Sequence, residues 1–128
     1  DGERKNHHET VCHEEETGPF MTKILAWHAE QVAYLYSELK ASGQAQDTVV
    51  LWMSDGGGQH HGGANKYPAI LLGEPGRILD TGKWVHYAEN ATPLARFHLT
   101  LANAFGSPIT SFGDGTDPGT GALSELLA

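Results

Sequence analysis

Two short apolar runs constrain the fold of this chain more than any other feature. They are Val49–Met53 and residues 67–73. Each is too short for a typical helix, and each is continuously apolar, a pattern typical of strands that are buried on both faces in a parallel sheet. Pro68 stands at the start of the second run, where a strand tolerates proline. The sequence therefore predicts two neighbouring parallel strands.

A long amphipathic segment precedes the first run. Between residues 20 and 42, apolar side chains recur every three or four positions, and Gly43 follows as a plausible end. This spacing predicts a single long helix. We interpret the aromatic side chains of Trp27 and Tyr34 as part of the buried face of that helix, rather than as a cofactor site.

A second helix is expected after Pro93, a residue that suits a helix start. Its apolar positions extend to Phe105, and Gly106 ends it. The order helix, strand, loop, strand, helix predicts an α/β fold, with a mostly parallel sheet and flanking helices. In such sheets, functional loops lie at the carboxyl ends of the strands.

Length and charge limit the organisation and the partners. The 128 residues suit one α/β domain, spanning 18–128, preceded by a polar arm, 1–17, that has no apolar periodicity. The net charge of −8 argues against binding to nucleic acid, which needs concentrated lysine and arginine. No apolar run approaches the roughly 20 residues of a membrane span.

The glycine-rich loop 54–65 is a candidate metal site. Asp55 follows the first predicted strand directly, and the glycines allow the backbone to bring His60 or His61 towards it. A carboxylate with imidazoles suits zinc, iron, manganese or copper. The alternative is a flexible surface loop with two solvated histidines.

The arm is the second candidate. It holds six acidic residues and three histidines, and His8, Cys12 and His13 are its candidate metal ligands. His8 and Cys12 are four residues apart, so they would share one face if this stretch were helical. The alternative is a solvated acidic arm. Together, the two stretches predict a divalent transition metal as cofactor, with zinc the best match, and iron, manganese and copper remain possible.

The order of several motifs resembles a known family. A histidine-rich stretch leads into a helix with Trp27-His28, a strand ends in Ser54-Asp55-Gly56, and a Ser-Phe-Gly-Asp sequence begins at Ser111. The chain resembles the carboxyl-terminal part of a bacterial family of unknown function that is named for its His-x-x-Ser-His-His motif. That family resembles the alkaline-phosphatase-like superfamily, and the implied fold is the carboxyl-terminal half of the superfamily fold.

The resemblance implies metal ligands at matching positions. Asp55 corresponds to the aspartate after a strand, and His60 or His61 to the later histidine. His8 and His13 match the outer histidines of the motif, whereas Val11 and Cys12 replace its central Ser-His. The resemblance also implies a periplasmic or secreted location.

Two functions follow from these observations. The first is a metal-dependent, hydrolase-like protein acting on phosphate or sulfate esters. No Gly-x-Ser-x-Gly elbow is present, and the resemblance places the nucleophile in an amino-terminal part of the precursor, which is then the expected partner besides an unknown substrate. The second is a non-hydrolytic metal-binding module with a redox or structural role.

Overall fold

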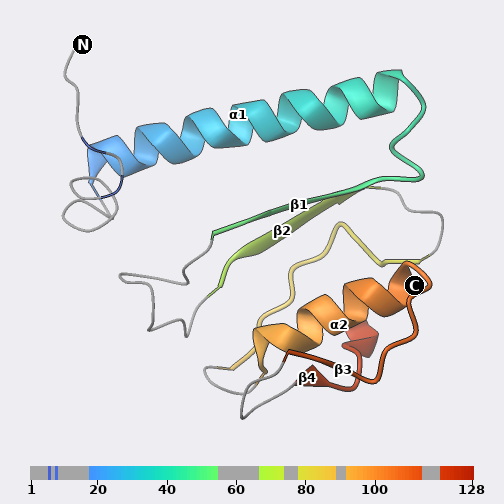
Figure 1. Ribbon diagram of the computed structural model, residues 1–128. Coiled ribbons are helices and arrows are strands. Elements are labelled where there is room, and N and C mark those ends of the chain that lie inside the picture. The colour runs from blue at the N-terminus through green and yellow to red at the C-terminus, as the bar shows by residue number, and fades with distance from the viewer. Residues whose placement is uncertain are drawn as a thin grey trace.

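The computed structural model describes residues 6, 8, 18–54, 67–73, 78–88, 92–113 and 119–128 (Figure 1). Two α-helices and two small strand pairs form its regular structure. The elements are α1 (Pro19–Ala41), β1 (Val49–Met53), β2 (Ala69–Gly73), α2 (Leu94–Ala104), β3 (Ser111–Phe112), β4 (Gly119–Thr120) and the short 3-10 helix η2 (Ser124–Leu126).

Helix α1 confirms the predicted long helix to within a residue at each end. Pro19 occupies its first turn, where a missing amide hydrogen costs nothing. The amide of Thr22 donates to the Gly18 carbonyl at 3.1 Å. After Ser42 the chain leaves the helix through Gly43, whose φ of +74° is a left-handed conformation that glycine adopts without strain.

The prediction of a mostly parallel sheet is wrong. Strands β1 and β2 lie where the two apolar runs place them, but they pair antiparallel, with Val49 opposite Gly73 and Met53 opposite Ala69. A parallel pair needs a crossover connection, usually a helix, and the glycine-rich sequence between these runs has no helical periodicity. The second sheet, β3–β4, is antiparallel as well. Among the described residues, the sheets are thus two separate antiparallel pairs.

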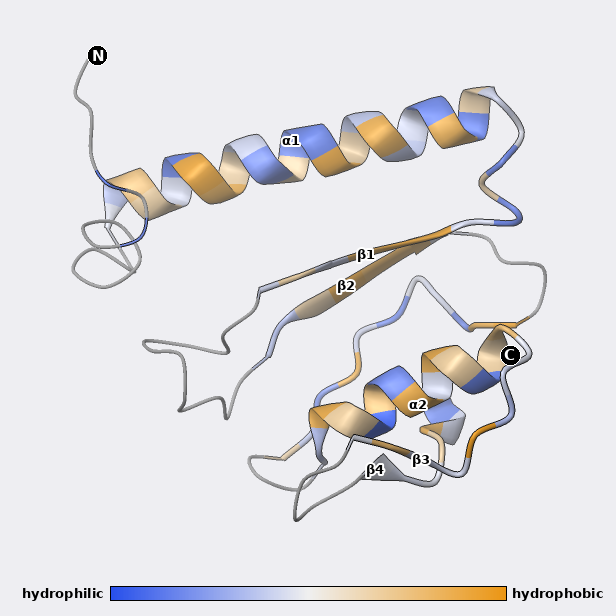
Figure 2. Cartoon of the chain, viewed as in Figure 1, coloured by the Kyte–Doolittle hydropathy of each residue, from blue (hydrophilic) through white to orange (hydrophobic). Residues whose placement is uncertain are grey.

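The continuous apolar character of β1 has another explanation than a parallel sheet. The β1–β2 pair lies between α1 on one side and α2 with its preceding segment on the other (Figure 1). All five residues of β1 are half-buried, so both faces of the strand are partly covered. Figure 2 shows the same strands as a hydrophobic layer between the helices.

The best-packed core surrounds α2. Leu99 and Thr100 of this helix are buried, together with Leu79 and Leu123 from segments before and after it. The carboxyl-terminal segment is held in place by an isolated antiparallel bridge between Leu79 and Leu127. Backbone hydrogen bonds therefore join the segment before α2 to the carboxyl-terminal segment.

Helix α1 is much less covered. Its Trp27 and Tyr34 side chains are 56% and 64% exposed, so their interpretation as core residues is wrong. The positions of α1 that are half-buried include Ile24, Val32 and Leu39. At about 100° per residue, Trp27 and Tyr34 project away from that side. Neither helix in the described ranges combines the length and the apolar character needed to cross a bilayer.

Candidate metal site

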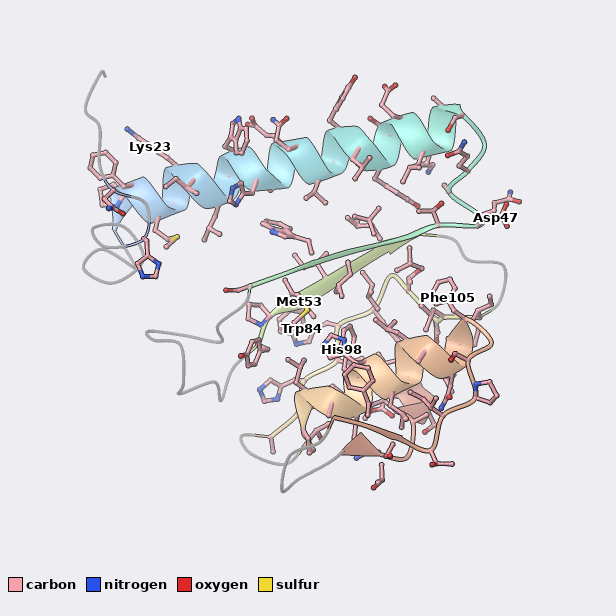
Figure 3. The ribbon with its side chains drawn as sticks, in the orientation of Figure 1. Lys23, Asp47, Met53, Trp84, His98 and Phe105 are labelled. Carbon is pink, nitrogen blue, oxygen red and sulfur yellow. The ribbon has the colours of Figure 1, made fainter. Side chains whose placement is uncertain are left out.

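The two ligand-rich stretches adjoin described elements whose relevant ends point towards the same end of the molecule (Figure 1). Helix α1 and strand β1 run in opposite directions, so the start of α1 and the end of β1 lie towards the same end (Figure 1). In Figure 3, Lys23 and Met53 mark these two positions, and Asp47 lies at the opposite end. The arm joins α1 at this end, and the loop that begins at Ser54 leaves β1 here.

The predicted ligands fall mostly outside the described residues. His8 is described and is exposed. The remaining candidates, Cys12, His13, Asp55, His60 and His61, lie outside the described residues. Within the part of the chain that the structure describes, no three histidine, cysteine or carboxylate side chains gather closely enough to hold a metal ion.

The other histidines lie apart from these stretches. His28 is half-buried on α1, and its ring lies 5.3 Å from that of Trp27. His98 on α2 lies between two phenylalanine rings, with its centroid 5.7 Å from Phe97 and 5.3 Å from Phe112. Because both histidine rings lie against aromatic rings, we interpret His28 and His98 as packing residues. His86 is exposed and provides a comparison for the ligand candidates.

Sequence reasoning missed a group of three polar side chains at Tyr87. The Tyr87 hydroxyl is buried and neighbours the Glu125 carboxylate, although within the described residues the geometry between them falls short of a regular hydrogen bond. Burial, followed by the neighbouring Glu125 carboxylate, raises the pKa of Tyr87. In return, the Tyr87 hydroxyl lowers the pKa of Glu125, and Arg96 adds to that effect. The Arg96 Nε also donates to the Gly121 carbonyl at 2.9 Å. No local sequence signal links these residues.

A shallow cleft of about 240 Å³ lies between α1 and β2. It is lined by residues Tyr36, Leu71, Leu72, Gly73, Thr81 and Gly82. Its polar groups are few, and the Thr81 hydroxyl is already used in a hydrogen bond of 3.1 Å to the Gly73 carbonyl. This lining lacks charged side chains, so it does not resemble a site for a phosphate or sulfate ester.

Comparisons of the chain with models of known protein families, with curated proteins and with solved structures find no match.

Proposed function

We propose that this protein binds a divalent transition metal, best matched by zinc, at one site shared by the arm and the β1–β2 loop. The proposed function is hydrolase-like, directed at phosphate or sulfate esters. The proposed ligands are drawn from His8, Cys12, His13, Asp55, His60 and His61.

One observation supports a shared site. The first residues of α1 and the last residues of β1 lie towards the same end of the molecule, so both ligand-rich stretches are attached there (Figure 3). Fixing a polar arm costs roughly 1–2 kcal/mol for each backbone residue. Joint coordination would offset that cost, because metal binding is coupled to folding.

The donor set suits the metal. Imidazole nitrogen, thiolate sulfur and carboxylate oxygen are the zinc ligands of proteins. A bound metal of this kind polarises an ester oxygen or lowers the pKa of water. Asp55 and the histidines would hold it at the end of β1. By the family resemblance, the nucleophile would come from an amino-terminal part of the precursor, and the location would be periplasmic or secreted.

The experiment is a measurement of zinc bound per chain after equilibrium dialysis. We expect one tightly bound zinc ion in the unmodified protein, and a loss of at least tenfold in affinity for Asp55→Ala and for His60→Ala/His61→Ala. His86→Ala is the matched control, because His86 is exposed and lies outside both stretches. Equal zinc binding by the control and by all ligand variants would refute the proposal.

The coordination number separates a hydrolase-like site from the non-hydrolytic alternatives. The visible absorption of the cobalt-substituted protein reports it. A closed set of four protein ligands would favour a structural role, whereas a site that binds an exchangeable water or added anion would favour hydrolysis. Reversible redox cycling of bound copper or iron would favour the redox alternative.

A further inference from the structure

We draw no further inference here: the strongest candidate, the exposed surface patch that Trp27 and Tyr34 form on helix α1, carries none, because nothing in the structure shows what covers that face of the helix.

Discussion

The amide of Leu123 donates a hydrogen bond of 2.8 Å to the hydroxyl of Thr100, a residue 23 positions earlier in the chain. The same hydroxyl donates to the Arg96 carbonyl at 2.7 Å, one turn back along α2. Thr100 is completely buried, and Leu123 is nearly so. A single side chain thus satisfies a buried amide and fixes the carboxyl-terminal segment against α2.

Replacing Thr100 by valine tests the importance of this link. Thr100→Val keeps the shape of the side chain but leaves the buried Leu123 amide without its acceptor. An unsatisfied buried group costs about 1–3 kcal/mol, and we expect a loss of that size in the free energy of unfolding. Urea denaturation measures it. Thr100→Ser, which keeps the hydroxyl, should lose clearly less, and an equal loss for both variants would contradict the explanation.

Gly119 provides a second test of packing on α2. A β-carbon at this buried position would collide with the backbone of Ala95 and Arg96. Because backbone atoms cannot move aside cheaply, Gly119→Ala should lower the free energy of unfolding by about 1–3 kcal/mol. Thr120→Ala on the same strand is exposed and should change it by no more than about 0.5 kcal/mol. Indistinguishable urea midpoints for the two variants would show that α2 and β4 are not in close contact.

The third prediction concerns alkaline pH. The pKa of Tyr87 is raised above its ordinary value of 10.0 in the folded protein. The Tyr87 hydroxyl therefore stays protonated in the folded state at pH values at which it ionises in the unfolded chain. This contribution to stability is therefore fully present below pH 10 and is lost as the pH rises further. Between pH 8 and pH 11, Tyr87→Phe should therefore lose less stability than the unmodified protein. Parallel loss of stability in both proteins would exclude Tyr87 as the cause.

Local patterns predicted the elements of the fold well. Helix α1 and strand β1 have almost the predicted ends, because apolar spacing, Pro19 and Gly43 act within a few residues of where they stand. The relative direction of two strands cannot be predicted in this way, because it depends on the path of the connection between β1 and β2. The apolar runs contain no information on that path, so the parallel pairing was wrong.

Sequence patterns could not predict contacts between segments that are far apart in the chain. Tyr87 and Glu125 meet only because α2 and the bridge at Leu79 bring their segments together. The prediction for Trp27 was wrong because apolar periodicity shows which residues are apolar and not which of them the fold buries. Of the predicted metal ligands, only His8 is among the described residues, so the site remains a prediction.

A fourth prediction follows from the family resemblance, which would place the nucleophile in an amino-terminal part of the precursor. The isolated 128-residue chain should show little turnover of aryl phosphate or aryl sulfate esters, even when saturated with zinc. A bound metal ion alone supplies only part of the rate acceleration, and a positioned nucleophile supplies the rest. Steady-state assays with chromogenic esters provide the measurement. Robust, zinc-dependent turnover by the pure chain, abolished by Asp55→Ala, would show that the chain contains a complete active site.

Hydrogen exchange in the arm tests the shared metal site most directly. Zinc should slow the exchange of backbone amides in residues 1–17 of the unmodified protein. The same zinc concentration should leave these amides fast in Asp55→Ala, although Asp55 is far from the arm in sequence, because a shared ion links the two stretches. His86→Ala should behave like the unmodified protein. If the arm is equally protected without zinc, or if zinc still protects it in Asp55→Ala, the arm and the loop do not share a metal ion.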